Sequence, residues 1–289
     1  MKKQLVANLE KRAMELVGRE KMEEEKIIRK LDSIRNRNAE IVKVIANGKI
    51  SKKEKVEEHE HVYYDVHLKY LIKMNEEMYL EEEIERRKAS FYRGGLFEDV
   101  ELPMHIPDER QEELFIVDDN LEDIQRERFT YNRLDAVRYA EKWWNTYNPA
   151  YEKFEVDCTN YISQCLHAGG APMRGYPNRS KGWWYQNKNW SYSWSVANAL
   201  KVYLQSSKTG LKAQEVNDPL QLKLGDVICY DFQGDGRFDH NTIVTAKDAS
   251  GMPLVNAHTY NSRMRYWAYE DSTAYTPNIK YKMFTIIDG

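Results

Sequence analysis

The uneven distribution of aromatic residues most constrains what this chain can fold into. All seven tryptophans lie after residue 140, and fifteen of the twenty tyrosines lie after residue 130. The first 125 residues instead carry charge runs such as Glu23–Glu25 and Glu81–Glu83. Because large aromatic side chains dominate cores, this shift predicts two regions with a boundary near residue 128. We expect 1–127 to be a helical hairpin plus short strands, an extension of unknown role, and 128–289 to be the main domain.

Composition excludes several classes of protein. The 289 residues carry a net charge of −3, which gives no reason to expect a nucleic acid or an anionic membrane as partner. No apolar run approaches the roughly 20 residues of a membrane span, and the start of the chain lacks the apolar segment of a secretory signal. A cytoplasmic protein is therefore expected, with unconventional export left open.

The three cysteines, Cys158, Cys165 and Cys229, are too few and odd in number for a disulfide scaffold. Cys165 follows Cys158 by seven residues on the same predicted helix face, and Cys229 lies within an apolar run. We expect these two to be buried hydrophobic residues. Cys158 differs because of its position at the start of a helix.

The first region begins with helical patterns. Leu5, Leu9, Ala13 and Leu16 have helical spacing. A second helix is predicted from a seam of steps of four and three that ends at Asn47–Gly48, namely Ile27, Leu31, Ile34, Asn38, Ile41 and Ile45. Residues 3–46 could bind a protein partner as a coiled coil. An amphipathic hairpin packed on its own domain is favoured, since the seam spans barely three heptads.

The rest of the first region changes period. Residues 62–72 alternate between apolar and polar side chains, which predicts a strand. Residues 78–92 give a mixed signal from which we favour a second strand, with a turn at 93–95 and a linker from Pro103 to Asn120. Scattered among charges, His59, His61 and His67 are expected to be solvated, and they form only a weak metal signal.

The second region places helices before strands. Helices are predicted at 132–145, with Asn132 as N-cap, at 158–168, ended by Gly169–Gly170, and at 195–204. A loop rich in Gly, Asn, Tyr and Trp separates the last two. Strands are predicted at 227–232, 238–246, 254–259, 263–269 and 280–287. This order predicts an α+β fold with an antiparallel sheet.

The cysteine helix suggests a nucleophile. A thiol in the first turn lies near unpaired backbone N–H groups and the positive end of the helix dipole, which favours the thiolate. His167 lies on the opposite helix face, whereas His240 and His258 lie on neighbouring predicted strands. A Cys–His pair with a third polar group can attack an amide, and N–H groups at the helix start could hold the oxyanion.

Three long motifs carry a family resemblance: DCTNYISQCLHAGGAPMRGYP, LGDVICYDFQGDGRFDH and NAHTYNSRMRYW. With them, residues 131–281 resemble the bacterial putative amidase domain family (Amidase_6), within the NlpC/P60 and CHAP group of papain-like cysteine peptidases and amidases. The resemblance implies a papain-like fold with Cys158 as nucleophile, His240 as general base and acid, and His258 as the residue that orients His240. Asn256 is the alternative for that third role, and Asp157 is expected to cap the helix.

Three other groups of residues could form sites. Asp231–Gly236 resembles the start of a calcium loop but lacks its later carboxylates, and Cys158, His240 and His258 could form a zinc site. Neither is favoured, so we expect no metal and no cofactor. Four tryptophans could either line a cleft or pack a loop over the core: Trp183, Trp184, Trp190 and Trp194.

The sequence thus predicts a cysteine-dependent amide hydrolase that acts on a peptide or muropeptide-like substrate of the cell-wall (peptidoglycan) type. The alternative is a catalytically silent binding or assembly module that uses the helical N-terminal region.

Overall fold

A computed structural model describes residues 1–19, 24–103 and 129–288. The chain forms two compact units, 1–104 with 268–275, and 105–267 with 276–289. The predicted boundary between 127 and 128, and most of the predicted linker, lie outside the described residues. Each unit is described by itself.

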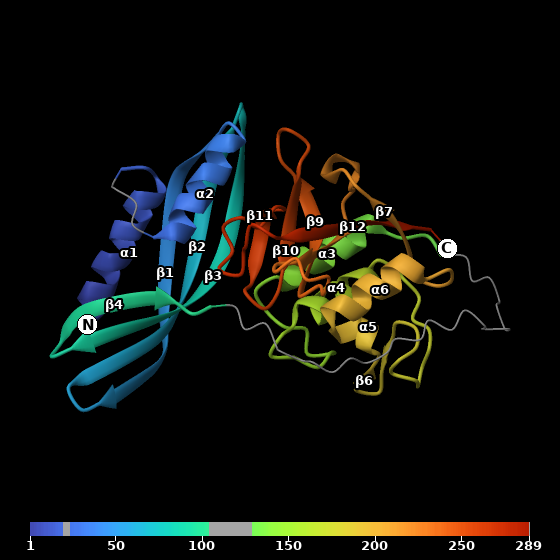
Figure 1. The fold of residues 1–289 in the computed structure, drawn as a ribbon, viewed down its shortest axis with the longest axis horizontal. Coiled ribbons are helices and arrows are strands. Elements are labelled where there is room, and N and C mark those ends of the chain that lie inside the picture. The colour runs from blue at the N-terminus through green and yellow to red at the C-terminus, as the bar shows by residue number, and fades with distance from the viewer. Residues whose placement is uncertain (20–23, 104–128, 289) are drawn as a thin grey trace. The chain divides into compact units, whose positions relative to one another are not determined.

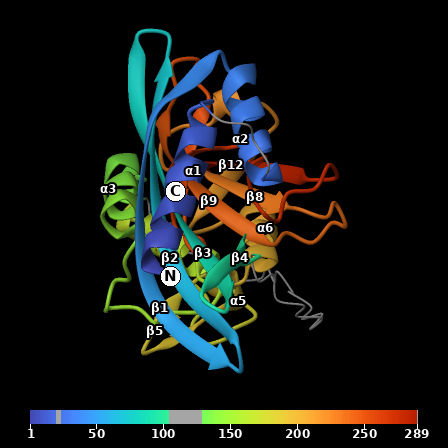
Figure 2. The same ribbon diagram turned by 90° about the vertical axis from the view of Figure 1, so that its left-hand side faces the viewer.

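The N-terminal unit is an antiparallel sheet with two helices on one face (Figures 1 and 2). Its first two strands are long and directly consecutive, and they pair from Ala39 opposite Met74 to Val56 opposite His59 with two register shifts, after Ile41 and after Ile50. The sheet order follows the chain. Its elements are α1 (Lys2–Leu16), α2 (Glu25–Asn36), β1 (Ala39–Val56), β2 (His59–Met74), β3 (Glu77–Tyr92) and β4 (Gly95–Glu101).

The second predicted helix is half wrong. It ends at Asn36, Asn38 turns with a left-handed φ of 55°, and residues 39–56 form β1. Ile27, Leu31 and Ile34 follow helical spacing, whereas Ile41 belongs to a strand and pairs with Ile72. The β-branched residues beyond 40 gain more from pairing with β2 than from continuing a helix. Residues 3–46 are therefore not a helical hairpin, and the two strands predicted at 62–72 and 78–92 are confirmed.

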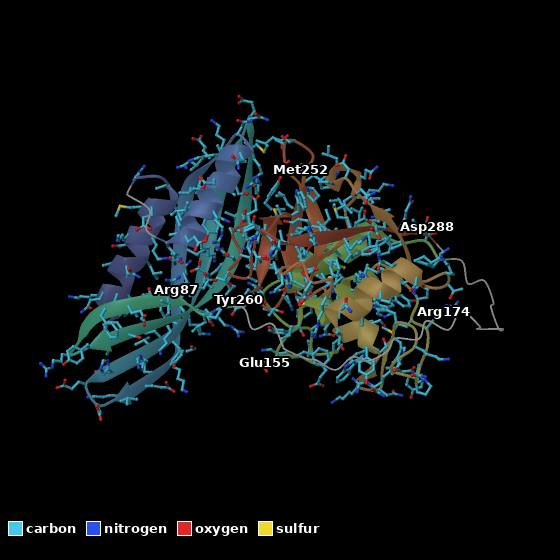
Figure 3. All side chains as sticks on the ribbon, viewed as in Figure 1. Arg87, Glu155, Arg174, Met252, Tyr260 and Asp288 are labelled. Carbon is cyan, nitrogen blue, oxygen red and sulfur yellow. The ribbon has the colours of Figure 1, made fainter. Side chains whose placement is uncertain are left out.

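A row of charged residues at every second position of β3 explains its mixed sequence signal. Glu81, Glu83, Glu85 and Arg87 (labelled in Figure 3) are all buried. Alternate residues of a strand share one face, and this row pairs with cations from the helices. Lys26 Nζ lies 2.8 Å from Glu85 Oε1 and 3.1 Å from Glu83 Oε2. The helices thus dock on the sheet through buried ion pairs as well as apolar contacts.

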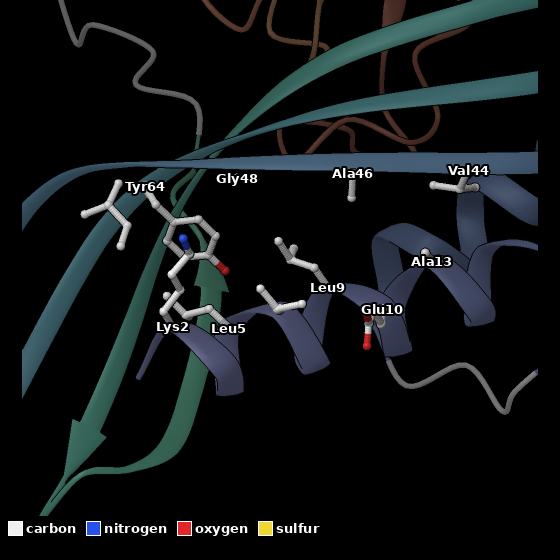
Figure 4. Close-up of a pocket in the computed structure, with 11 residues that line it drawn as sticks. Lys2, Leu5, Leu9, Glu10, Ala13, Val44, Ala46, Gly48 and Tyr64 are labelled. Atoms are coloured by element: carbon white, nitrogen blue, oxygen red, sulfur yellow. The ribbon is translucent and has the colours of Figure 1, made fainter.

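An apolar cavity of about 300 Å³ lies between α1 and the sheet in this unit (Figure 4). Leu5 and Leu9 point from α1 toward β1, and Gly48 leaves room beneath them. The remaining lining residues are Lys2, Val6, Glu10, Ala13, Val44, Ala46, Ile50 and Tyr64.

The C-terminal unit combines helices with an antiparallel sheet, which confirms the predicted α+β class. Its sheet has the order β11-β10-β9-β8-β12-β7. The helices are α3 (Arg133–Trp143), α4 (Cys158–Ala168), α5 (Tyr192–Ser195) and α6 (Ala197–Ser206), with a short 3₁₀ turn at Pro219–Gln221. The strands are β7 (Lys212–Val216), β8 (Val227–Asp231), β9 (His240–Lys247), β10 (Pro253–Ala257), β11 (Ser262–Tyr266) and β12 (Lys280–Ile287), with the small hairpin β5 (Tyr185–Gln186) and β6 (Asn189–Trp190).

Local signals in this unit were mostly reliable. The Asn132 side chain caps α3 by accepting from the Asp135 N–H at 3.2 Å. The buried face of α3 is formed by Ala136 and Ala140, whereas Leu134 is 57% exposed. Strand β7 was missed, since its sequence KAQEV lacks an apolar alternation. Among the described residues, no helix combines the length and apolar character that crossing a bilayer requires.

Helix α4 packs against the sheet and gives this unit its core. Tyr161, Ile162, Cys165 and Leu166 are fully buried, and Cys229 of β8 joins the same cluster. The predictions for Cys165 and Cys229 are therefore confirmed, because both are buried and carry free thiols. The packing fixes the start of α4 against the neighbouring strands.

Candidate active site

Cys158 is the first residue of α4, as predicted, and its side chain is buried. The preceding Asp157 does not cap the helix with its side chain. A residue about 100 positions later replaces it: the Thr259 hydroxyl accepts the backbone N–H groups of Asp157 and of Cys158, each at 3.2 Å. Thr259 holds a φ of 82°, which is strained for a β-branched residue. The N–H group of Cys158, expected to hold an oxyanion, is thus bonded to a hydroxyl.

Three polar groups contact the Cys158 sulfur. The Thr159 hydroxyl lies 3.7 Å from Sγ, and the Thr259 hydroxyl and the backbone N–H of Asn241 also hydrogen-bond to it. These bonds lower the pKa of the thiol, but burial outweighs them and raises it above its ordinary value. The helix dipole contributes well under the cost of desolvating a thiolate. The expectation of a resting thiolate is therefore not met, and Cys158 rests as a thiol.

His240 begins β9 and directly precedes the residue that bonds the sulfur. Its ring lies against Tyr230 and Phe232, with centroids 5.8 and 6.2 Å away. Burial, and secondarily the charge of Arg265, lowers the pKa of His240 to about 3. The imidazole is therefore neutral at physiological pH.

The pairing of β8 with β9 places the side chains of His240 and Asn241 on opposite faces of the sheet. His240 pairs with Tyr230, whereas Asn241 pairs with Cys229. Side chains of paired residues share a face and successive residues alternate. The Asn241 side chain accordingly turns toward α4, where its Nδ2 donates to Thr159 Oγ1 at 3.0 Å, and the His240 side chain turns toward Tyr230.

His258 follows the last residue of β10 and lies beside the start of α4. Its Nδ1 lies 2.7 Å from Asp157 Oδ2, and its Nε2 lies 2.7 Å from the Trp143 carbonyl oxygen. The ring stacks on Tyr161 at a centroid distance of 3.9 Å. Both ring nitrogens are thus bonded to acceptors, and the contacts of His258 are with the helix start.

The Asp157 carboxylate connects three segments. Besides His258, it accepts the Phe154 N–H at 3.1 Å and the Asn160 side-chain amide at 2.8 Å through Oδ1. Because Asp157 is 1% exposed, these bonds replace the water that a buried carboxylate would lose. Asp157 and His258 together fix the residue before Cys158.

Asn256, the alternative third residue, is fully engaged elsewhere. Its Oδ1 accepts from the Thr245 hydroxyl at 2.8 Å and from the Met264 N–H at 2.9 Å. Its Nδ2 donates to Glu141 Oε1 at 2.8 Å. These contacts brace strands β9, β10 and β11 against α3.

Three of the four candidate cleft tryptophans are core residues. Trp183, Trp184 and Trp194 are at most 1% exposed. Trp183 donates its indole N–H to Ser163 and Trp194 to Asn160, each within 2.9 Å. Trp190 is partly exposed and stacks on Tyr185 at 6.1 Å. Packing of the loop over the core therefore accounts for the first three.

Residues Asp231–Gly236, which resemble the start of a calcium loop, form a turn that is held by hydrogen bonds. The Asp231 carboxylate accepts the backbone N–H groups of Gly234, Asp235 and Gly236 between 2.7 and 3.2 Å. Within the part of the chain that the structure describes, no three His, Cys, Asp or Glu side chains are grouped to hold a metal ion.

A family model described as a putative amidase domain matches residues 130–284, which include the cysteine helix and the strands beside it. The chain belongs to this amidase family. Uncharacterized protein YhbB of Bacillus subtilis (strain 168) is 55% identical over 230 residues, 78% of this chain and 74% of the relative. Uncharacterized protein YjcM of the same organism is 34% identical over 140 residues, 45% of this chain but 31% of its own length. No solved structure matches the chain. Membership in the amidase family indicates an amide hydrolase in general.

Sequence reasoning missed two residues of this site in the amidase domain, Thr259 and Asn241. Each directly follows a histidine that was singled out, so proximity in sequence was an available signal. Their roles depend on a left-handed backbone at Thr259 and on the β8–β9 register at Asn241. Neither can be read from residue types alone.

Proposed function

We propose that the chain is a cysteine-dependent amide hydrolase with Cys158 as its nucleophile. One observation carries the proposal: the strand that begins with His240 passes the first residue of α4 closely enough for the Asn241 N–H to bond to the Cys158 sulfur. The thiol of Cys158 and the neutral imidazole of His240, the residue before Asn241, are the groups that nucleophilic amide cleavage requires. Membership in an amidase family supports the same chemistry.

The proposed reaction proceeds by acyl transfer. The His240 ring turns toward Tyr230 in the structure, so the proposal requires it to turn toward Sγ when substrate binds. His240 then removes the thiol proton as Sγ attacks the carbonyl carbon, and the tetrahedral intermediate collapses. The C–N bond breaks, the protonated His240 gives its proton to the leaving amine, and a thioester forms on Cys158. A water molecule, deprotonated by His240, attacks the thioester, so that the carboxylic acid leaves and the thiol is restored.

In this proposal His258 is a positioning residue that acts through Asp157. Its two hydrogen bonds and its stacking on Tyr161 hold the start of α4, and hence Cys158, against the sheet. Asn256 is proposed to act on the strands and not on the imidazole, because its amide bonds Thr245, Met264 and Glu141.

The proposed substrate is a peptide or muropeptide-like amide of the cell-wall type. Support comes from the resemblance of residues 131–281 to the NlpC/P60 and CHAP group of papain-like enzymes. That resemblance also supports a papain-like fold for the C-terminal unit, whose helix-then-antiparallel-sheet order is compatible with it.

The test compares two cysteine variants of the same helix on a panel of muropeptides and small amides. We expect Cys158→Ala to abolish hydrolysis. Cys165→Ala, which removes a buried thiol two turns away, should retain most of it. Equal activity of Cys158→Ala and wild type on any amide that the wild type cleaves would contradict the proposal.

A binding or assembly module is the second candidate function. The observation that favours it is the apolar cavity between α1 and β1, lined by Leu5, Leu9 and Ile50 (Figure 4). It predicts that an Ala46→Phe change, which fills the cavity, abolishes association with a partner. Hydrolysis would then be absent from the wild type as well as from Cys158→Ala.

A further inference from the structure

Asn241 contributes a buried polar atom that the proposed chemistry leaves unused. The side chain is 0% exposed and its Nδ2 is anchored on Thr159 at 3.0 Å. Its Oδ1 has no hydrogen-bond partner among residues 1–19, 24–103 and 129–288. The backbone N–H of the same residue bonds to the Cys158 sulfur. An unsatisfied acceptor therefore belongs to a residue that contacts the proposed nucleophile.

A buried acceptor without a hydrogen-bond donor destabilises the fold, and two other asparagines near the site, Asn160 and Asn256, have donors for their side-chain oxygens. Leaving a buried acceptor without a donor costs about 1–3 kcal/mol. Asn160 bonds through both side-chain atoms to Trp194, Asp157 and the Glu152 carbonyl, and Asn256 is bonded at every polar atom. The exception at Asn241 coincides with its contact to Cys158. A buried unsatisfied group calls for an explanation, and a role in catalysis or ligand binding is one of the recognised explanations.

We propose that Asn241 is a substrate-binding residue whose Oδ1 accepts the N–H of the amide that Cys158 attacks, so that the substrates are amides that carry an N–H. This inference rests on the proposed function and specifies its substrate class.

Reaction geometry supports the assignment. Attack requires the carbonyl carbon about 3–3.5 Å from the sulfur, and the amide nitrogen lies about 1.33 Å from that carbon. The N–H of a bound amide therefore comes within reach of a group adjacent to Sγ. Thr159 fixes the Asn241 amide so that Nδ2 is used and the acceptor Oδ1 is the atom left for a ligand. A tertiary amide or an ester offers no hydrogen to this acceptor.

The decisive experiment measures a ratio within each protein. The rates of hydrolysis of N-acetyl-L-alanine p-nitroanilide and of its N-methyl anilide are compared in wild type, Asn241→Leu and Asn241→Asp. One neutral hydrogen bond corresponds to about a tenfold effect, so the preference for the N–H substrate should fall about tenfold in Asn241→Leu. Asn241→Asp retains an acceptor and should retain the preference. A partly unfolded variant lowers both rates together and leaves the ratio unchanged.

A second probe separates this inference from the proposed function. Iodoacetamide and 2-iodo-N,N-dimethylacetamide alkylate Cys158 without any hydrolysis, and peptide mass mapping identifies the labelled cysteine. The rate ratio of the two reagents should fall several-fold in Asn241→Leu. If the anilides are not cleaved but this ratio falls, the proposed function fails and Asn241 still binds an N–H donor. Unchanged ratios with both probe pairs, as expected if Oδ1 only holds a structural water, would overturn the inference.

Discussion

Replacement of Thr259 by valine tests the structural basis of the Cys158 site. The Thr259 hydroxyl accepts two backbone N–H groups at the start of α4, each at 3.2 Å, and bonds to the sulfur. Valine has nearly the same shape but lacks the hydroxyl, and it has the same strain at a φ of 82°. The substitution therefore removes the cap and leaves the packing and the backbone strain unchanged.

The expected loss of stability in Thr259→Val is that of removing a helix cap. Removing an N-cap side chain costs about 0.5–2 kcal/mol, and a buried N–H left without an acceptor costs about 1–3 kcal/mol. We expect the free energy of unfolding of the C-terminal unit to fall by about 2 kcal/mol. For a unit of this size that corresponds to a drop in Tm of roughly 4–8 °C. The pKa of the Cys158 thiol should rise, because one of the bonds that lowers it is lost.

Denaturant unfolding and the pH dependence of Cys158 alkylation measure the two effects. Thr259→Ser is the matched control, since it keeps the hydroxyl, and it should retain the wild-type alkylation profile. The reasoning would be refuted by a valine variant with wild-type stability and an unshifted alkylation profile. A serine variant that behaves like valine would also refute it, because the effect would then come from the methyl group.

Three further predictions concern buried charge. The pKa of His240 in the folded chain is about 3, below its ordinary value of 6.5, so the stability that the neutral ring contributes is lost as pH falls from 6.5 toward 3. In His240→Phe, the free energy of unfolding should lose this part of its pH dependence in acid unfolding curves. Burial is the main cause that raises the pKa of Glu101 to about 7, so its contribution to stability is present below pH 4.5 and lost as pH rises through 7. Between pH 5 and pH 8, the free energy of unfolding in urea should therefore change less in Glu101→Gln than in wild type. Lys30→Met removes the ion pairs of Lys30 with the buried carboxylates of Glu81 and Asp271 and should cost about 3–5 kcal/mol by urea unfolding. Adding Glu81→Leu should recover part of this loss.

Local sequence signals predicted much of the C-terminal unit. The cap at Asn132, the start of α4 at Cys158 and the strands of the antiparallel sheet depend on neighbouring residues, and the structure contains them. The amide at Asn256 and the ring of His258 were assigned by resemblance to a role on His240. Their hydrogen bonds depend on the contacts of β10 with α3 and α4, which residue spacing cannot specify.

The N-terminal unit shows why the helical spacing of residues 27–45 predicted a helix that is too long. Ile27, Leu31 and Ile34 continue at helical spacing into Ile41, yet a turn at Asn38 interrupts them and pairing with β2 decides the rest. The charged residues of β3 also obscured its period, because Glu81–Glu85 includes residues of high helix propensity. Their burial depends on the cations of α1 and α2 that meet them. Long-range pairing of this kind is outside the reach of a local pattern.

The burial of both proposed reacting groups, Cys158 and His240, was not predicted from the sequence either. A helix-start position alone suggests a lowered pKa for Cys158, but the strand and the turn that cover it raise the pKa instead. The proposed mechanism therefore begins from a neutral thiol and a neutral imidazole, with proton transfer as substrate binds.

Mass spectrometry of the acyl-enzyme tests the central claim most directly. The full chain is mixed with a cleaved amide, quenched in acid within the first turnover and digested, and the peptide that contains Cys158 is weighed. We predict a mass increase equal to the acyl group on Cys158, which is absent from the Cys158→Ala variant. Amide hydrolysis at the wild-type rate without any acyl group on Cys158, or with the acyl group on another residue, would contradict the account.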